Sequence, residues 1–355
     1  MMEKTLAALP RRRRVLYVTG MAPFGTTTFR YAALQRLGQD VQPFDWRPYA
    51  FRFSLLNSIR NRYPLGPLVS RVNRDLRRAV QSFRPDVVWF DKPIYFTPAT
   101  MRAIHQAGAR IVFYVQDGPF GPRKDGYWRQ FYRVFRMADL HCLVREADVA
   151  RYRAWDLPWI KTMFSFDPVM QFPPPAGWSD ADRDRELSYI GHPHEERPKF
   201  LLGLAEQHGL PLSIDGNGWQ SVFSPEQLAS YVRHGHLLGD AYREHIWKSK
   251  INLSFVTHDN EDDIAHKSVE IAACGSFLLA LRTPGHLSIF EEDREAVFFS
   301  SVEECADKAR FYLGRSDLRE QIGRKAHERA LRSGYDNDSQ LSRILNRLDG
   351  KQESG

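Results

Sequence analysis

The sequence has few cysteines and no long hydrophobic run. Its 355 residues include three cysteines, Cys142, Cys274 and Cys305, an odd number at wide spacing. This pattern excludes a disulfide framework and a paired Cys-x-x-Cys metal site. No apolar run approaches the roughly 20 residues of a membrane-spanning helix, and the basic run Arg11 to Arg14 does not lead into the apolar segment of a secretory signal. We therefore expect a cytoplasmic protein that does not cross a membrane.

Several nucleotide-binding signatures are also missing. The loop 23–28 lacks the Gly-Lys-Ser/Thr ending of a P-loop, and no G-x-G-x-x-G with an acidic partner follows a strand-like segment. No helix-turn-helix, zinc-finger or RNP pattern occurs, which makes nucleic acid an improbable partner.

Charge is distributed unevenly between the two halves of the chain. Residues 1–170 carry 28 Lys and Arg against 13 Asp and Glu, a net charge of +15, whereas residues 171–355 carry 22 against 30, a net charge of −8. A basic half favours contact with an anionic membrane surface, a phosphorylated acceptor or nucleic acid. The runs 11–14 and 51–63 mix basic and apolar residues as peripheral membrane segments do, although a solvated face is the simpler interpretation.

Short β-branched and aromatic runs alternate with helix-length segments along the chain. Expected strands are 15–20, 41–45, 87–91, 111–117, 140–144 and 161–166 in the first half, and 187–192, 212–216, 251–256, 277–281 and 296–300 in the second. This alternation predicts an α/β protein with two Rossmann-like domains, each built on a parallel sheet. The Pro-rich stretch 172–178 predicts a linker. We expect domains at 1–170 and 187–335, a linker at 171–186, and a C-terminal helix and tail at 336–355, the helix packing on the first domain.

The most informative segment is 258–280, where acidic residues precede a helix that ends before Gly275. His266, Lys267 and Glu270 share one face of this helix because three and four residues separate them. Lys267 is suited to a departing diphosphate and Glu270 to ribose hydroxyls, with His266 assisting either task. A plain surface pair between Lys267 and Glu270 is the alternative.

This segment resembles the signature of retaining GT-B glycosyltransferases, in particular the group related to the spore-maturation protein CgeB. The resemblance rests on Lys267, Glu270, the small residues 272–275 and the hydrophobic run 277–279, and it extends downstream over about 80 residues. Asp262 stands where the broader families have glutamate, and Lys267 stands where the related group commonly has arginine. The resemblance implies a GT-B fold with an interdomain cleft, a nucleotide-sugar donor in the second domain and no cofactor or metal.

Glycine turns after two expected strands of the second half add candidates for donor binding. Gly191 and Arg197 are similar to the glycine turn and basic residue that approach the donor diphosphate in this superfamily. Asn217 lies in the turn 215–218, whose backbone lines a base or sugar pocket or is a plain turn. Trp219 is either a stacking surface for a nucleobase or a core residue. His192 and His194 make a poor metal pair because a third ligand is missing.

The first half supplies candidates for the acceptor side. Gly25 and Thr26 belong to the loop after the first strand, where small and hydroxyl residues suit an acceptor. Asp117 ends the fourth expected strand and is a candidate general base, or else it caps the turn at Gly118.

These features predict a glycosyltransferase that moves a sugar from a nucleoside-diphosphate sugar to a glycan, a lipid-linked acceptor or another hydroxyl. By resemblance we expect retention of configuration without a metal. The alternatives are a nucleotide-sugar epimerase and a non-catalytic protein that binds glycan or membrane.

Overall fold

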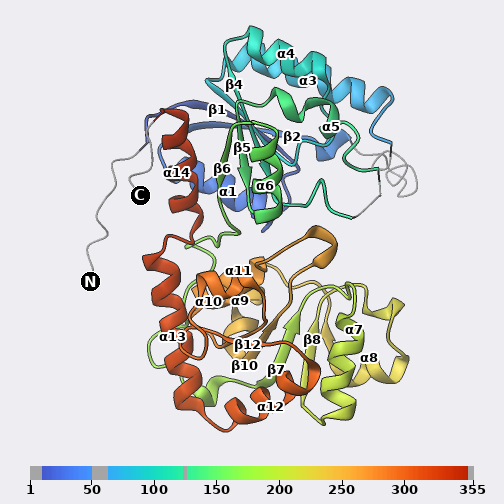
Figure 1. Ribbon diagram of the computed structural model, residues 1–355, viewed down its shortest axis with the longest axis vertical. Coiled ribbons are helices and arrows are strands. Elements are labelled where there is room, and N and C mark those ends of the chain that lie inside the picture. The colour runs from blue at the N-terminus through green and yellow to red at the C-terminus, as the bar shows by residue number, and fades with distance from the viewer. Residues whose placement is uncertain (1–9, 50–62, 123–125, 351–355) are drawn as a thin grey trace. The chain divides into compact units, whose positions relative to one another are not determined.

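The computed structural model describes residues 10–49, 63–122 and 126–350, and these residues form two compact units. The first unit comprises Met1–Met163, Asp259–Glu261 and Asn337–Gly355. The second comprises Phe164–His258 and Asp262–Asp336. The chain therefore passes into the second unit after Met163 and returns after Asp336 (Figure 1).

The first unit is built on a six-stranded parallel sheet in the order β2-β1-β3-β4-β5-β6. Its strands are β1 (Arg14–Thr19), β2 (Asp40–Asp45), β3 (Val87–Asp91), β4 (Arg110–Val115), β5 (Leu140–Leu143) and β6 (Trp159–Lys161). Every residue of β3 is buried, as are all residues of β4 after the first. Continuous apolar runs of this kind are typical of strands that helices cover on both faces.

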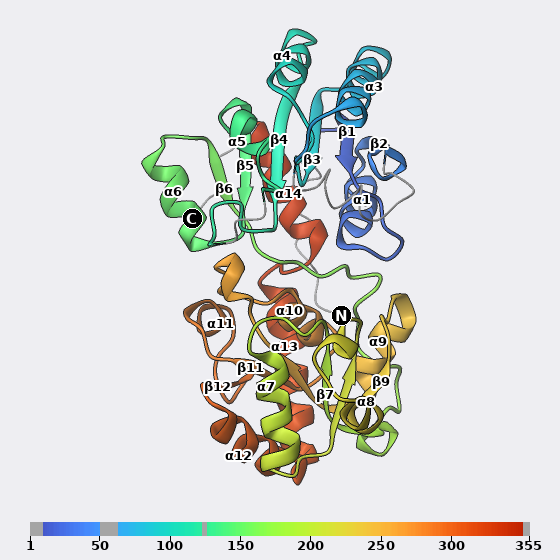
Figure 2. The ribbon, with the colours of Figure 1, turned by 90° about the vertical axis from the view of Figure 1, so that its right-hand side faces the viewer.

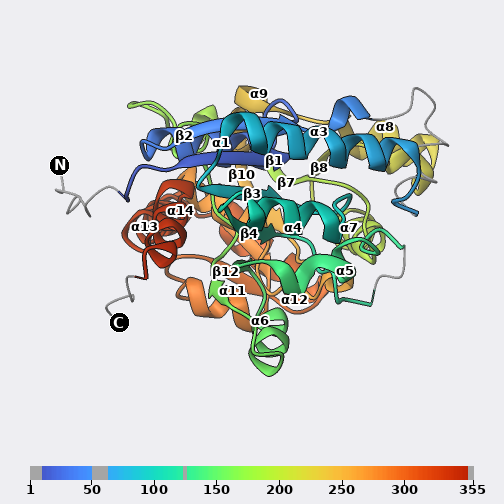
Figure 3. The same cartoon turned by 90° about the horizontal axis from the view of Figure 1, so that it is seen from above.

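Within the described residues, α-helices accompany this sheet. They are α1 (Thr26–Arg36), α3 (Pro67–Phe83), α4 (Pro98–Gln106), α5 (Phe131–Val134), α6 (Glu146–Ala154) and α14 (Asn337–Leu348). Helix α3 buries Val69, Val72, Leu76, Val80 and Phe83, a stripe at helical spacing, and lies beside α4 (Figure 3). Helix α14 packs on α1 although about 300 residues separate them in sequence.

The second unit repeats this plan with a parallel sheet in the order β12-β11-β10-β7-β8-β9. Its strands are β7 (Arg185–Ile190), β8 (Leu212–Asp215), β9 (Val232–His234), β10 (Ser249–Ser254), β11 (Leu278–Leu281) and β12 (Val297–Phe299). Its helices are α7 (Arg197–Leu202), α8 (Pro225–Tyr231), α9 (Gly239–Lys248), α10 (His266–Ala273), α11 (Pro284–Ile289), α12 (Val302–Leu313) and α13 (Ser316–Arg332). Helix α13 packs against α10 (Figure 2). Gly323 of α13 permits close approach, because a Cβ there would stand 2.5 Å from the Gly275 carbonyl oxygen.

The strands match the pattern predicted from sequence, with two corrections. The expected strand 161–166 is β6 at Trp159–Lys161, and the chain leaves the sheet after it. The apolar residues that suggested a longer strand, Phe164 and Phe166, instead belong to the second unit. Strand β9 was not expected, because its half-buried Val232 is followed by two exposed polar residues and gives no periodic signal.

Each sheet reverses its direction of strand addition at one place. The reversal lies between β1 and β3 in the first unit and between β7 and β10 in the second. In open α/β sheets, ligands bind outside the carboxyl ends of the strands at such a point. The loops that follow Thr19, Asp91, Ile190 and Ser254 are therefore the places to look for function.

A buried ion pair fixes the reversal point of the first sheet. The Arg30 guanidinium of α1 donates to the Asp91 carboxylate at the end of β3, with an Nε–Oδ2 distance of 2.7 Å. The Tyr17 hydroxyl donates to the same oxygen at 2.6 Å, and the Arg30 guanidinium lies over the Tyr114 ring at 4.7 Å. Removing either partner would leave an unpaired buried charge, which is strongly destabilising. The pair therefore holds α1 against the sheet.

Three histidines are buried in the two units, and burial lowers the pKa of each. The pKa falls to about 3 for His141 and His245 and to about 4 for His286. Each is therefore neutral in the folded protein at pH 7, whereas the unfolded chain takes up protons near pH 6.5. The free energy of unfolding should fall as the pH drops below 6.5, until each folded-state pKa is reached.

We predict that His141→Phe makes this acid loss smaller. His141 lies among the rings of Phe113 and Tyr152, so phenylalanine keeps the aromatic packing and removes the titrating group. The variant should lose less stability than the wild type between pH 6.5 and 5, by at most about 2 kcal/mol. Denaturant unfolding at each pH measures this, with His258→Asn as the control because the His258 side chain is 72% exposed. Parallel curves for His141→Phe and the wild type would contradict the prediction.

Candidate functional site

Two glycines bring the loops after β7 and β8 into contact at the carboxyl edge of the second sheet. The Gly191 amide donates to the Asp215 carbonyl oxygen at 2.8 Å. Gly216 has a φ of 137°, and a Cβ there would stand 2.1 Å from the Gly191 carbonyl oxygen. Only glycine fits this crossing. Trp219 is 1% exposed and donates from Nε1 to the Gly191 carbonyl oxygen at 3.0 Å, so its ring is part of the core and the interpretation as a base-stacking surface is wrong.

Arg197 joins the loops on the two sides of the reversal point. It begins α7, is 8% exposed, and donates to the Tyr189 hydroxyl at 3.2 Å. Its Nη2 donates to the Val256 carbonyl oxygen at 2.9 Å and to the Thr257 hydroxyl at 2.8 Å. Arginine suits this place because its planar guanidinium presents five donors at fixed angles. Arg197 therefore holds the loop after β10 against the end of β7.

Helix α10 presents the three residues that the sequence placed on one face. Five of its eight residues are buried, and His266, Lys267 and Glu270 remain partly exposed. Burial lowers the pKa of the Lys267 ammonium, Glu270 opposes that shift, and Arg197 adds to it. Lys267 on α10 and Arg197 on α7 both belong to segments that follow the strands at the reversal point of this sheet.

The carboxylate of Glu270 is held by a tyrosine that sequence reasoning missed. The Tyr242 hydroxyl of α9 donates to Glu270 Oε2 at 2.6 Å. Burial and then the Glu270 charge raise the pKa of Tyr242 well above its ordinary value, so the hydroxyl remains a donor. The Lys267 ammonium lies 5.8 Å from the centre of the Tyr242 ring. Tyr242 therefore orients one carboxylate oxygen and lies beneath the neighbouring cation.

His266 has a different environment from its two neighbours. Its Nε2 lies 2.9 Å from the Ser165 carbonyl oxygen and 3.8 Å from Glu270 Oε1, and its ring stacks on Phe164. Because a carbonyl oxygen only accepts, Nε2 carries the proton. His266 thus anchors the chain segment that enters the second unit. Its ring lies in the same cluster as Glu270.

The remaining donor-side candidates lie on loops at the same edge. The Asp262 amide donates to the Thr257 carbonyl oxygen at 3.1 Å, so Asp262 is linked to Arg197 through Thr257. Asn217 is exposed, and its carbonyl oxygen lies 3.0 Å from His192 Nδ1. The structure thus gathers Gly191, Arg197, Asn217, Asp262, His266, Lys267 and Glu270 on the loops and helix that follow β7, β8 and β10.

The acceptor-side candidates lie at the corresponding edge of the first sheet. Asp117 follows β4 and pairs with the Lys92 ammonium, which follows β3, at 2.5 Å. Burial alone would lower the pKa of Lys92. The Asp117 carboxylate outweighs burial, so the pKa of Lys92 is raised. Gly25 precedes α1 and Thr26 begins it, with the Thr26 hydroxyl accepting from Arg30 Nη2 at 3.3 Å.

Lys92 was also missed from sequence, although a signal for it existed. It directly follows β3, and the ends of neighbouring parallel strands meet at one edge, so its proximity to Asp117 follows from the strand order. Tyr242 gave no such signal, because its role depends on how α9 is rotated.

The structure also bears on the metal and membrane expectations. Among the described residues, no group of three His, Cys, Asp or Glu is arranged to hold a metal ion. No helix in the described part of the chain is long and apolar enough to span a membrane. Of the basic runs, Arg13 is buried and pairs with Asp349, so it is not available to a membrane surface. Residues 51–62 of the run 51–63 lie outside the described residues.

Comparison with known proteins gives a family match in the second half and extensive fold matches. Residues 196–346 match a family described as glycosyl transferase-like, which covers less than half of the chain. A search of curated proteins by sequence finds no match.

Solved structures resemble the chain over almost its whole length. Sucrose-phosphate synthase from Thermosynechococcus elongatus has a TM-score of 0.68 at 9% identity, with 96% of this chain and 100% of that one covered. Anabaena Alr3699/HepE in complex with UDP-glucose has a TM-score of 0.65 at 13% identity, with 96% and 100% covered. A Listeria monocytogenes protein assigned as a UDP-N-acetylglucosamine 2-epimerase has a TM-score of 0.59 at 12% identity, with 96% and 98% covered.

At these identities the structural matches establish the fold, and they confirm the predicted α/β architecture of two Rossmann-like domains. The more specific resemblance to the CgeB-related group stays a prediction. The chain therefore has the GT-B fold, and its residues 196–346 are similar to the glycosyl transferase-like family.

Proposed function

We propose that this protein is a glycosyltransferase that takes its sugar from a nucleoside-diphosphate sugar bound to the second unit. The observation that carries the proposal is the placement of Lys267 and the oriented carboxylate of Glu270 on α10, with Arg197 on α7, at the reversal point of the second sheet. The glycosyl transferase-like match covers the same residues. Structures that share the fold include one described as a complex with UDP-glucose.

Each part of a donor has a matching group in this arrangement. Lys267 binds the diphosphate directly, and Arg197 acts as a positioning residue that adds positive charge from beneath the loop it holds. The turn at Gly191, where a Cβ would stand 2.5 Å from the Tyr189 hydroxyl oxygen, borders the place proposed for the diphosphate. Glu270 accepts hydrogen bonds from ribose hydroxyls, while Asp262, His266 and Asn217 border the same edge.

In the proposed reaction, the bond between the anomeric carbon and the diphosphate oxygen breaks and a bond from that carbon to an acceptor oxygen forms. The acceptor hydroxyl loses its proton to Asp117, whose pairing with Lys92 is exchanged for contact with the acceptor. The diphosphate leaves with its added negative charge countered by Lys267 and Arg197. We propose retention of configuration and activity without a metal ion, with an acceptor near Gly25 and Thr26 that is a glycan, a lipid-linked sugar or another hydroxyl compound.

A nucleotide-sugar epimerase is the second candidate, because an epimerase-assigned protein shares the fold over nearly the full chain. The two activities differ in what they require. An epimerase converts the nucleotide sugar without an acceptor, whereas a transferase releases nucleoside diphosphate in proportion to acceptor.

Lys267→Ala should abolish most of the donor affinity. The charge-assisted hydrogen bonds of an ammonium contribute about 1.5–3 kcal/mol, which corresponds to a loss of roughly ten- to hundredfold in affinity. Thermal unfolding with UDP-, GDP-, dTDP-, ADP- and CMP-sugars measures the effect, since a ligand of the folded state raises its midpoint. Lys248→Ala is the matched control, because Lys248 directly precedes β10 at the opposite edge of the sheet. A donor shift that survives in Lys267→Ala would overturn the assignment.

Glu270→Gln should weaken binding of the nucleotide but not of pyrophosphate. If Glu270 accepts from the ribose 2′-hydroxyl, the wild type should bind the 2′-deoxy nucleotide roughly tenfold more weakly. In Glu270→Gln the difference between the two nucleotides should shrink, because a neutral amide oxygen accepts more weakly than a carboxylate. Isothermal titration with the four combinations measures this. If the wild type and Glu270→Gln distinguish the nucleotide from its 2′-deoxy form equally well, the ribose does not bind at Glu270.

A further inference from the structure

Helix α10, which carries His266, Lys267 and Glu270, begins without a side-chain cap of its own. Its N-cap residue is Ala265, whose methyl group cannot accept a hydrogen bond from the first amides of the helix. The amides of a first helical turn have no partner within the helix, so a buried start needs an acceptor from another element. At Ala265 this acceptor is His286 of the neighbouring helix α11 (Figure 2).

The imidazole of His286 contacts the start of α10 through one ring nitrogen. Its Nε2 lies 3.2 Å from the Ala265 amide nitrogen and 2.9 Å from the Ser268 hydroxyl oxygen. Its Nδ1 lies 2.7 Å from the carbonyl oxygen of Leu281, the last residue of β11. Because a carbonyl oxygen only accepts, Nδ1 carries the proton and Nε2 is the acceptor for both groups. His286 therefore links the end of a core strand to the first turn of α10.

Burial keeps this imidazole neutral and in one orientation. His286 is 0% exposed, and burial lowers its pKa to about 4, so Nε2 stays unprotonated at pH 7. Its ring stacks on Phe298 of β12, with 5.8 Å between ring centres and 11° between planes. The His286 amide donates to the hydroxyl of Thr283, the N-cap residue of α11, at 3.0 Å. The acceptor is therefore held in place from three sides.

The chain that leads into α10 is attached to α11 at two further points. The Thr283 hydroxyl donates to the Asp263 carbonyl oxygen. Gly285 lies against the same residue, because a Cβ there would stand 2.5 Å from the Asp263 carbonyl oxygen. The segment 263–265 is thus fixed to α11 directly before the chain reaches His266 and Lys267.

We propose that His286 is a positioning residue for donor binding, which orders the first turn of α10 so that Lys267 meets the donor diphosphate. Lys267 lies between Ala265 and Ser268, the two residues whose groups donate to Nε2. Without this acceptor the buried Ala265 amide loses its partner, and the turn that carries Lys267 loosens. A nucleotide that needs the ordered turn then binds in proportion to the fraction of molecules in which that turn is ordered. This inference rests on the proposed glycosyltransferase function.

Two substitutions of His286 separate the acceptor from the ring. His286→Phe keeps an aromatic ring beside Phe298 and removes the acceptor. His286→Gln keeps an acceptor, because the amide oxygen of glutamine is as many bonds from Cα as Nε2 is. In isothermal titrations with UDP, GDP, dTDP and ADP, the affinity should fall about fivefold in His286→Phe, the size of effect expected of a lost helix cap. His286→Gln should recover most of this loss, which a role in core packing alone would not predict.

His141→Phe is the matched control. His141 is also a buried histidine whose pKa is lowered by burial, but it belongs to the first unit, so the same replacement should leave nucleotide affinity unchanged. Ser268→Ala keeps the test decisive if His286→Phe does not fold. It removes one of the two donors to Nε2 and should weaken nucleotide binding by about twofold. Unchanged affinity in His286→Phe, or in Ser268→Ala where His286→Phe does not fold, would overturn the proposal.

Amide hydrogen exchange tests the order of the first turn without any nucleotide. The Ala265 amide should exchange faster in His286→Phe than in the wild type and His286→Gln, while the amides of β4 in the first unit should not change. Faster exchange with unchanged nucleotide affinity would overturn the role of His286 in donor binding. A wild type that binds none of the four nucleotides, with exchange as expected, would contradict the proposed function and not the ordering of α10 by His286.

Discussion

The parallel direction of the strands is the constraint on which the rest of this structure depends. In a parallel sheet every strand ends at the same edge, so the loops after β7, β8 and β10 meet, as do those after β1, β3 and β4. Lys267 and Arg197 are far apart in sequence, and both lie on segments that follow this edge for this reason. The same geometry brings Asp117 to Lys92 in the first unit.

Buried hydrogen bonds then hold the charged side chains on these loops in defined positions. The Arg197 guanidinium donates to the Tyr189 hydroxyl, the Val256 carbonyl oxygen and the Thr257 hydroxyl. The Tyr242 hydroxyl orients Glu270. Burial lowers the pKa of Lys267, with Arg197 adding to the shift. Two cations on segments that follow the same edge of the sheet suit the anionic ligand that we propose.

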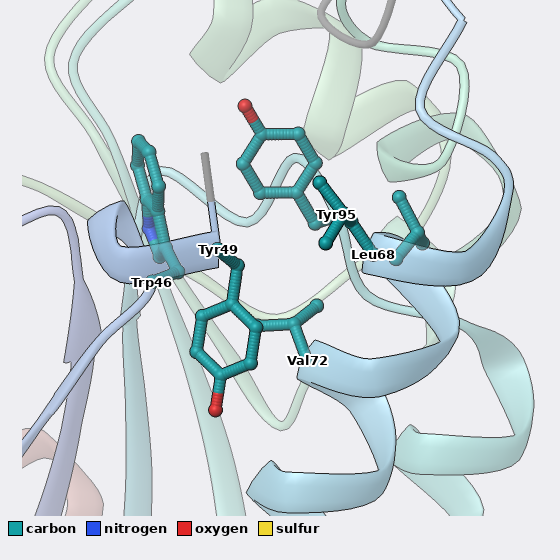
Figure 4. Close-up of a pocket in the computed structure, with 6 residues that line it drawn as sticks. Trp46, Tyr49, Leu68, Val72 and Tyr95 are labelled. Atoms are coloured by element: carbon teal, nitrogen blue, oxygen red, sulfur yellow. The ribbon is translucent and has the colours of Figure 1, made fainter. Parts of the chain in front are cut away.

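The sequence was sufficient to predict the architecture because buried parallel strands are continuous apolar runs and the intervening helices have a distinct period. It was also sufficient to place His266, Lys267 and Glu270 on one face of a helix, since residues three and four positions apart in a helix point to the same side. Residues whose role depends on three-dimensional packing could not be predicted. Tyr242 reaches Glu270 only through the rotation of α9, and β9 forms from a segment with one half-buried residue. The small gap between the side chains of Trp46, Leu68 and Tyr95 lies among three segments that no local sequence pattern connects (Figure 4).

The most direct test of the account is a crystal structure of the protein with UDP or the nucleotide that best raises its thermal stability. The account predicts density for the diphosphate beside Lys267 and the Gly191 backbone, with the ribose within hydrogen-bond distance of Glu270. A nucleotide bound elsewhere in the second unit, or bound with its ribose away from Glu270, would contradict it.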